Sequence, residues 1–176
     1  EKAEALKHIQ DVALLKNEDN SLSRINRIEG YDISHFGGKD TYGAMAVFEG
    51  IEANKEQYRL FKIREVTQSD DLMALEEVIS RRLRHLEWRL PDLILIDGGR
   101  PQIERISKLF QTKRITIPFV GISKYQNDKL IFPKNTKTSL KEMIASMKAI
   151  LLEVREESHR FAISASRRKR RESFKA

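Results

Sequence analysis

The sequence lacks cysteine, has only four prolines and eight glycines, and carries no long apolar run. Without cysteine the chain can form no disulfide and no thiolate metal site, which fits a reducing compartment. No stretch comes close to the roughly 20 apolar residues that cross a bilayer, so no membrane span is predicted. No signal peptide is visible, and the chain starts at Glu1 and not at Met, so we expect a piece of a longer protein.

What is present predicts one soluble globular domain with a basic end. With 176 residues, 40% of them hydrophobic and 34% charged, the chain is long enough for one buried core. The formal net charge is +7, and most of it lies from Arg160 onward, where seven basic side chains accompany one acidic side chain. Such a tail suits a polyanion such as nucleic acid, or it is only a solvated terminus. We therefore expect an N-terminal helix and linker over 1–23, a folded domain over 24–166 and a basic tail over 167–176.

An apolar stretch from Leu93 to Asp97 organises the chain. Its continuous apolar character predicts a strand that is buried on both faces, as at the centre of a covered sheet. Gly98 and Gly99 let the backbone turn directly after it. Asp97 therefore lies where a central strand leaves the sheet, and ligands of open α/β sheets bind at that edge. The alternative is that Asp97 only caps the helix that begins near Pro101.

A second carboxylate, that of Asp32, lies in the middle of the first predicted strand, Arg27 to Phe36. Aspartate is disfavoured inside strands. A locally costly residue in a core element indicates a functional site. The alternative is a structural aspartate that is satisfied by hydrogen bonds.

Helices are predicted on both sides of the central strand and at the C-terminal end. Ser69 is a plausible N-cap, and the carboxylates of Asp70 and Asp71 suit a helix N-terminus better than a metal site. A second helix starts at Pro101. The last helix begins at a capping box, 139–142, and its apolar stripe is long and regular: Ile144, Met147, Leu151, Val154, Ser158 and Phe161. His159 lies beside this stripe, so we expect it to be half-buried, although a single such histidine is more often structural than catalytic.

The order of the predicted elements gives the fold class. A turn at 37–40 and strands at 42–48 and 57–64 continue the first strand into a three-stranded antiparallel meander. Helix, strand, helix, strand and helix follow, the second of these strands at 115–122, and strands joined through helices favour a parallel portion. The result is an α/β fold with a mixed five-stranded sheet flanked by helices, a layout similar to that of ribonuclease H. In that layout Asp32 and Asp97 face one another, and a residue of the last helix completes the site.

Three segments, in order along the chain, carry a family resemblance: Tyr31-Asp32-Ile33-Ser34-His35, Leu90-Pro91-Asp92-Leu93-Ile94-Leu95-Ile96-Asp97-Gly98-Gly99 and Arg155-Glu156-Glu157-Ser158-His159-Arg160-Phe161-Ala162. They resemble the C-terminal endonuclease domain of UvrC, the incising subunit of bacterial nucleotide excision repair. The resemblance implies a catalytic triad of Asp32, Asp97 and His159, with Asp32 and Asp97 as ligands of a divalent metal ion, Mg²⁺ or Mn²⁺. It further implies a 5′ incision in damaged double-stranded DNA, and contact with UvrB through segments outside this chain.

The matched positions offer two carboxylates, whereas two-metal nucleases need several, so we expect one metal ion with His159 as general base. Glu157 is the main rival for that role. Basic side chains near the triad are the predicted phosphate contacts, which would make binding salt-dependent. They are Arg100, Lys124, Arg160, Arg167, Arg168 and Lys169, with the remainder of the basic run to Arg171.

Two other functions stay open from the sequence. One is another ribonuclease H-like nuclease, such as an endonuclease V-like enzyme that acts on deaminated bases. The other is a DNA-binding module that has lost catalysis, although all three triad residues are present. For the function implied by the resemblance, we expect a monomeric domain in the bacterial cytoplasm, associated with the nucleoid.

Overall fold

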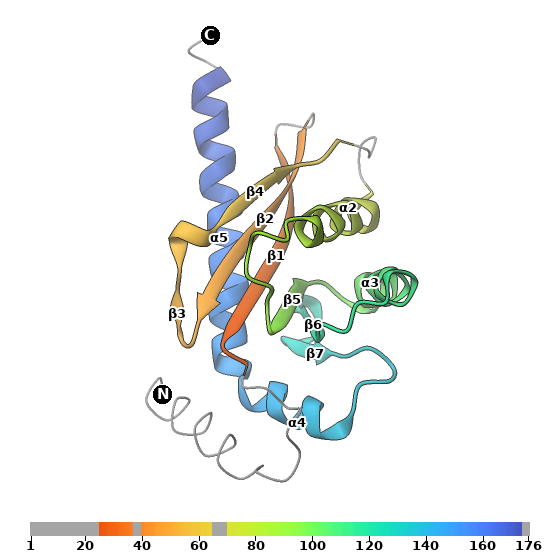
Figure 1. Ribbon diagram of the computed structural model, residues 1–176. Helices are drawn as coiled ribbons and strands as arrows, with labels where there is room; N and C mark the ends of the chain where they lie inside the picture. Colours follow the sequence, from red (N-terminus) through yellow and green to blue (C-terminus); the bar gives the residue numbers. More distant parts are fainter. Residues whose placement is uncertain (1–24, 37–39, 65–69, 174–176) are drawn as a thin grey trace.

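A computed structural model describes residues 25–36, 40–64 and 70–173 of the chain (Figure 1). The elements are, in chain order, β1 (Arg27–Phe36), β2 (Asp40–Glu49), β3 (Glu52–Ala53), the 3₁₀ turn η1 (Lys55–Gln57), β4 (Arg59–Lys62), α2 (Asp71–Arg84), β5 (Leu93–Asp97), α3 (Arg100–Lys113), β6 (Phe119–Ser123), the 3₁₀ turn η2 (Lys124–Gln126), β7 (Lys129–Ile131), α4 (Thr138–Ser146) and α5 (Lys148–Ser173). The predicted N-terminal helix and linker over 1–23 and residues 37–39 of the predicted turn lie outside the described residues.

A mixed sheet forms the centre of the described residues. Its seven strands have the order β3-β2-β1-β5-β6-β7, and β4 also pairs with β2. β1 runs antiparallel to β2 and parallel to β5, which in turn is parallel to β6. The predicted fold class, with its meander and its parallel portion, is confirmed. The predicted number of five strands was too low, because β3 and β7 have only two and three residues and give no periodic signal.

Helices cover both faces of this sheet (Figure 1). α2 and α3 lie on one face, where Val78 and Ile103 belong to one buried core. α4 and α5 lie on the other face, where Ile144, Leu151 and Val154 belong to a second core. Because alternate residues of a strand point to opposite faces, β1 and β5 contribute to both cores.

The last predicted helix is two helices in the structure. α4 ends at Ser146, and α5 starts at Lys148. Met147, with φ of −94° and ψ of 8°, separates them. The apolar stripe predicted one helix because Ile144, Met147 and Leu151 all enter the same core from the two sides of the break. Residues 167–173, predicted as a tail, continue α5 beyond the edge of the sheet (Figure 1).

The predicted helix starts were partly wrong. The N-cap of α2 is Asp70, whose carboxylate accepts hydrogen bonds from the backbone N–H groups of Leu72 and Met73. Ser69, the expected cap, lies outside the described residues. α4 begins one residue before the expected capping box, with Lys137 at the N-cap position and no side-chain cap. Among the described residues, no helix combines the length and the apolar character that a membrane crossing requires.

A buried ionic cluster lies on the α2 face of the sheet. The Glu29 carboxylate accepts hydrogen bonds from the guanidinium groups of Arg27 and Arg82 and from the Tyr31 hydroxyl. Arg27, Glu29, Arg82 and Tyr31 are each at most 2% exposed. Burial, followed by the charge of Glu29, raises the pKa of Tyr31 well above its ordinary value. The cluster connects β1 to α2 on the face of the sheet that is opposite to Asp32.

Candidate metal and nuclease site

Asp32 lies in the middle of β1, and its side chain points to the α5 face of the sheet. It is 8% exposed, and the Ser34 hydroxyl donates a hydrogen bond to its Oδ2 atom at 3.2 Å. Burial raises the pKa of Asp32, although hydrogen bonds and charge from His159 and the hydrogen bond from Ser34 lower it in part. A charged carboxylate at such a buried position lowers the stability of the fold unless another group stabilises its negative charge.

Asp97 is the last residue of β5, next to Asp32 across the sheet. The parallel pairing of β1 with β5 sets Ile28 beside Leu93 and Gly30 beside Leu95, so the same two-residue step brings Asp32 and Asp97 together. Burial raises the pKa of Asp97, and the negative charge of Asp32 raises it further. The alternative function for Asp97 was wrong, because Gly99 and not Asp97 is the N-cap residue of α3.

The two glycines after Asp97 are fixed by hydrogen bonds. The Gly98 N–H donates to the Ile122 carbonyl at 3.1 Å, and the Gly99 N–H donates to Gln102 Oε1 at 3.0 Å. The Asp97 backbone is therefore held by both β6 and α3.

His159 reaches the carboxylates from α5. Its Nδ1 atom lies 3.2 Å from Asp32 Oδ2, and the imidazole is 58% exposed, which is more than the half-buried position that was expected. Gly30 allows this approach, because a Cβ atom at that position would lie only 2.5 Å from Val154 Cγ1 of α5. The absence of a side chain at one strand position thus sets how closely the histidine-bearing helix packs on the sheet.

The three predicted triad residues come together in one place. One ligand atom from each of Asp32, Asp97 and His159 lies within 4.8 Å of the others. Carboxylate oxygens and a histidine nitrogen are the donors that divalent metal ions take in proteins. The negative charge of Asp32 also raises the pKa of Asp97, and a cation bound between the two carboxylates would relieve this repulsion. The residues present therefore fit a divalent ion.

Glu157, the rival of His159, points away from the carboxylates. It accepts a hydrogen bond from the Tyr58 hydroxyl at 3.0 Å and forms an ion pair with Arg160. The hydrogen bond from Arg160 lowers the pKa of Glu157. The Glu157 carboxylate thus already has hydrogen-bond partners, Tyr58 and Arg160, among the described residues.

The predicted phosphate contacts lie in different surroundings. Lys124 follows β6, and its charge lowers the pKa of Asp97, so it lies near the triad. Arg100 opens α3 and donates a hydrogen bond to the Phe132 carbonyl. Arg160 is paired with Glu157 and shares a hollow with Glu52, Glu153 and Glu156.

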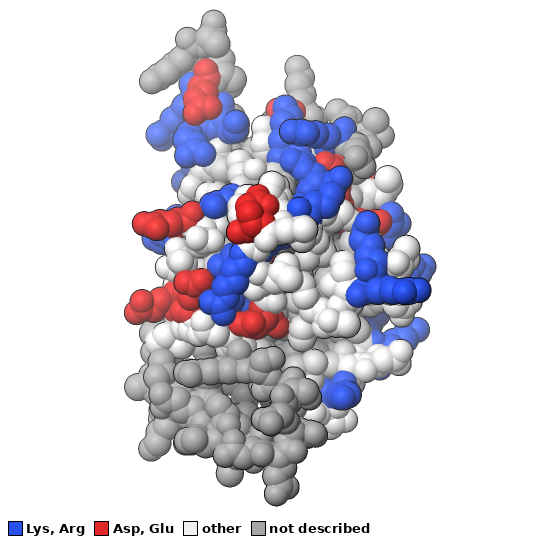
Figure 2. Space-filling model, in the orientation of Figure 1, with Lys and Arg blue, Asp and Glu red and all other residues white. Residues whose placement is uncertain are grey.

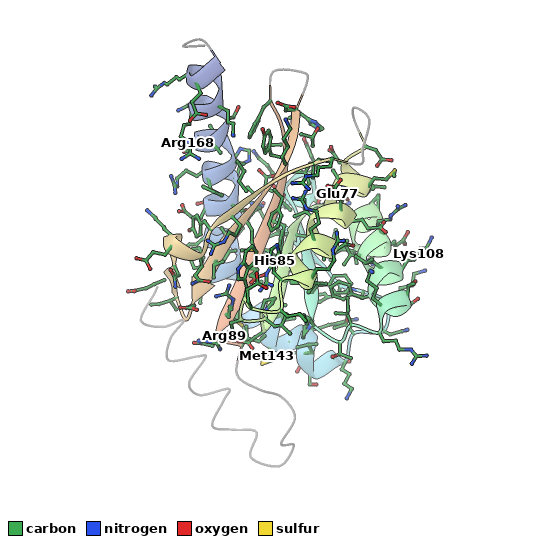
Figure 3. The ribbon with its side chains drawn as sticks, turned by 45° about the horizontal axis from the view of Figure 1, so that its top comes forward. Glu77, His85, Arg89, Lys108, Met143 and Arg168 are labelled. Atoms are coloured by element: carbon green, nitrogen blue, oxygen red, sulfur yellow. The ribbon has the colours of Figure 1, made fainter. Side chains whose placement is uncertain are left out.

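The basic end of α5 lies away from this acidic hollow. Arg167, Arg168 and Lys169 are exposed, and Figure 2 shows Lys and Arg gathered over this end of α5, whereas Asp and Glu gather near β3. In Figure 3, Arg168 on α5 and Lys108 on α3 lie on opposite sides of the molecule. The basic surface is therefore divided into separate regions.

Two residues of the site were not singled out from the sequence. Ser34 donates to Asp32, and its place two residues further on the same face of the strand was the available signal. Arg155, one helical turn before His159, lowers the pKa of Asp97 and forms an ion pair with Asp128. Arg155 belongs to the third family-like segment, but its role depends on a contact across 27 residues that no local pattern indicates.

Comparisons with known proteins identify the family of the chain. The family model described as the UvrC RNAse H endonuclease domain matches residues 17–163. The chain is 41% identical over 149 residues to the UvrABC system protein C of Methanococcoides burtonii, covering 81% of this chain and 24% of that protein. It is 35% identical over 173 residues to the protein of the same name from Caldicellulosiruptor saccharolyticus, covering 96% of this chain and 28% of that protein. The chain thus spans about a quarter of the length of these curated relatives.

Solved structures give more distant similarities. Ciona intestinalis Endonuclease V in complex with a 24mer DNA that contains an inosine is 17% identical, with a TM-score of 0.47, and the match covers 84% of this chain and 66% of that chain. The catalytic domain of human Endonuclease V is 20% identical, with a TM-score of 0.39 and coverage of 81% and 66%. The family match, which spans most of the described residues, selects between the endonucleases considered from the sequence. The chain belongs to the family of UvrC RNase H endonuclease domains.

Proposed function

We propose that this chain is a divalent-metal-dependent endodeoxyribonuclease that makes the 5′ incision at damaged DNA in nucleotide excision repair. The observation that carries the proposal is the convergence of Asp32, Asp97 and His159, whose ligand atoms lie within 4.8 Å of one another. These residues come from β1, β5 and α5, three elements far apart in the sequence. Membership of an endonuclease-domain family supports the same conclusion.

Asp32 and Asp97 are the proposed metal ligands. Mg²⁺ and Mn²⁺ prefer oxygen donors, and both carboxylates point to one place on the α5 face. When bound, such an ion supplies a Lewis acid that polarises a phosphate and favours an activated water. The raised pKa of each carboxylate supports the proposal, because a cation would favour the charged forms that burial disfavours.

His159 is the proposed general base. When its Nδ1–H donates to Asp32 Oδ2, its Nε2 atom carries the free lone pair. The imidazole is more than half exposed, so Nε2 can accept a proton from a water molecule that attacks the phosphate. Asp32 then has two roles, because it also orients the ring through Nδ1. Glu157 is excluded from this proposal, because Tyr58 and Arg160 hold its carboxylate.

The DNA contacts are proposed from charge and position. Arg100 follows shortly after β5, which carries Asp97, and Lys124 follows the neighbouring strand β6; both are exposed. Arg167, Arg168 and Lys169 extend the basic surface along α5. Each phosphate that is neutralised on duplex DNA adds about −0.9 to the slope of log affinity against log salt. Because Arg160 is held by Glu157, we expect its removal to change this slope least.

The setting of the reaction is also part of the proposal. We expect a domain over 24–166 that acts as a monomer on damaged double-stranded DNA, in the cytoplasm and at the nucleoid. UvrB would be bound by segments outside this chain, since the chain spans only about a quarter of its curated relatives. A domain that cuts at damage must not depend on base identity, so we expect weak duplex binding without sequence preference.

A nicking assay on lesion-containing duplex with Mg²⁺ or Mn²⁺ tests the proposal. Asp32→Asn should abolish nicking and weaken metal binding measured by calorimetry. His159→Ala should abolish nicking but keep the metal, and Glu157→Ala on the same helix is the matched control that should keep both. An active Asp32→Asn or His159→Ala variant would contradict the assignment. Efficient cutting of inosine-containing duplex in place of damaged duplex would favour the endonuclease V-like alternative.

A further inference from the structure

The connection between β6 and β7 is a tight hairpin beside the triad. Ser123 pairs with Lys129, so residues 124–128 form its tip. Asn127 and Asp128 have φ angles of 54° and 56°, in the left-handed region that tight turns use. The tip therefore has a defined backbone conformation.

This tip is attached to the site at two points. Asp97 pairs with Ile122, two residues before Lys124, and the Gly98 N–H donates to the Ile122 carbonyl. Asp128 forms an ion pair with Arg155 of α5, one helical turn before His159. The elements that carry Asp97 and His159 thus both contact the hairpin.

Tyr125 at this tip is 99% exposed, the highest value among the exposed large hydrophobic side chains of the described residues. Its neighbours in the tip, Lys124, Gln126 and Asn127, are polar and exposed. Folding gains nothing from a ring in this position, since its apolar area stays in water. An exposed aromatic ring on a hairpin of defined conformation beside the triad is accessible to a partner outside the chain.

The surroundings of Tyr125 indicate which kind of partner. A protein interface hot spot is an aromatic anchor that lies within a patch of further contacts, and polar exposed residues surround this ring. Aromatic rings beside cations, here Lys124 and Lys129, are typical of nucleic-acid surfaces, where a ring stacks on a base and lysines meet phosphates. One exposed aromatic ring can stack on one planar group, such as a nucleobase, without further apolar contacts around it.

We propose that Tyr125 stacks on a nucleobase next to the phosphate that is cut, on a base whose face is unstacked. In regular duplex DNA each base face is covered by its neighbours, so the ring can bind only where stacking is broken. The inference rests on the proposed function, and it adds a preference for locally opened DNA over perfect duplex. Because the ring lies at the tip and not among the ligands, Tyr125 is a binding residue and not a catalytic one.

Binding to a bubble duplex with 2-aminopurine in the opened segment tests the inference, with a fully paired duplex for comparison. Loss of one base stack should weaken binding of Tyr125→Ala to the bubble by about 5- to 150-fold, and abolish the fluorescence quenching that the ring causes. Tyr125→Phe should keep the affinity and the quenching. Binding to the paired duplex should change less than about twofold, since Lys and Arg contacts to phosphate dominate there. Leu86→Ala, at a side chain that is 84% exposed, is the matched control and should match wild type.

Three outcomes would overturn the inference: bubble binding by Tyr125→Ala at wild-type affinity, unchanged quenching, or equal losses on bubble and paired duplex. Normal DNA binding with lost self-association in sedimentation velocity would also overturn it, by showing a protein contact. Nicking by the same samples separates the two proposals. If wild type nicks in an Asp32-dependent manner while Tyr125→Ala binds normally, stacking fails and the proposed function stands. If wild type neither binds nor nicks, both fail.

Discussion

Gly30 offers a direct test of whether the packing distance of α5 sets the geometry of the site. Its position on β1 is two residues before Asp32 and on the same face. A Cβ atom there would lie 2.5 Å from Val154 Cγ1 and 3.4 Å from the Val154 carbonyl oxygen. Ordinary carbon–carbon contacts are about 3.5–4.0 Å, so in Gly30→Ala the helix or the valine must retreat by about 1 Å.

Valine cannot easily turn away, because a β-branched side chain in a helix has one strongly preferred χ1 rotamer. Overpacking of this kind costs about 1–3 kcal/mol, and replacing a strand glycine by alanine returns about 0.5–1 kcal/mol. We therefore expect a net loss of about 1–2 kcal/mol in the free energy of unfolding. A displacement of about 1 Å would also break the 3.2 Å contact between His159 and Asp32 and lower nicking by about 100-fold.

Urea denaturation and single-turnover nicking at saturating metal measure the two effects. Gly43→Ala is the matched control, because a Cβ atom there would lie 2.3 Å from Val78 Cγ2 of α2, on the other face of the sheet. It should lose similar stability but keep nicking. Val154→Ala combined with Gly30→Ala should restore both properties in part, with a coupling energy of about 0.5–3 kcal/mol. Gly30→Ala that nicks within about twofold of wild type, or a double variant with no recovery, would refute the reasoning.

Three further predictions concern contacts outside the triad. Glu29→Gln removes the carboxylate that two buried arginines share, and should cost about 3–5 kcal/mol in chemical denaturation. A loss below about 1 kcal/mol would contradict a buried ionic role. Asp70→Ala removes the α2 cap and should cost about 1 kcal/mol, seen as a lower midpoint of thermal unfolding. Tyr58→Phe loses one hydrogen bond to Glu157 and should cost about 0.5–1.5 kcal/mol while nicking is unchanged; a large fall in nicking would show that Glu157 is needed for catalysis.

The local sequence carried enough information for the strands that hold the carboxylates. β1 and β5 have the predicted bounds. An apolar run that ends in glycine marks β5, and alternation of Tyr31, Ile33 and His35 before a turn marks β1. Asp32 and Asp97 could be identified from the same strands, because each is a charged residue at a position where a buried strand normally has an apolar residue. The pairing of these strands then follows from the fold class.

Other features depend on contacts between distant residues. The break at Met147 leaves the apolar stripe intact, so periodicity cannot reveal it. β7 has too few residues for a pattern and exists because β6 offers it a partner edge. The exposure of His159 depends on how far α5 stands above the sheet, which the pair Gly30 and Val154 determines. The sharing of Glu29 by Arg27 and Arg82 likewise spans 53 residues and has no local signature.

The three triad residues lie far apart in the sequence, and this separation determines when the proposed site can form during synthesis. His159 meets Asp32 across 127 residues, and β1 meets β5 only after β2 and α2 have been placed between them. During synthesis from the N-terminus, a chain that has reached β6 already holds both carboxylates but no histidine. Among the elements of this domain that carry the triad, α5 is made last and therefore completes the proposed cutting site, and a domain truncated before α5 has no complete triad. Potentially harmful cleavage of DNA is in this way postponed until the domain is fully formed.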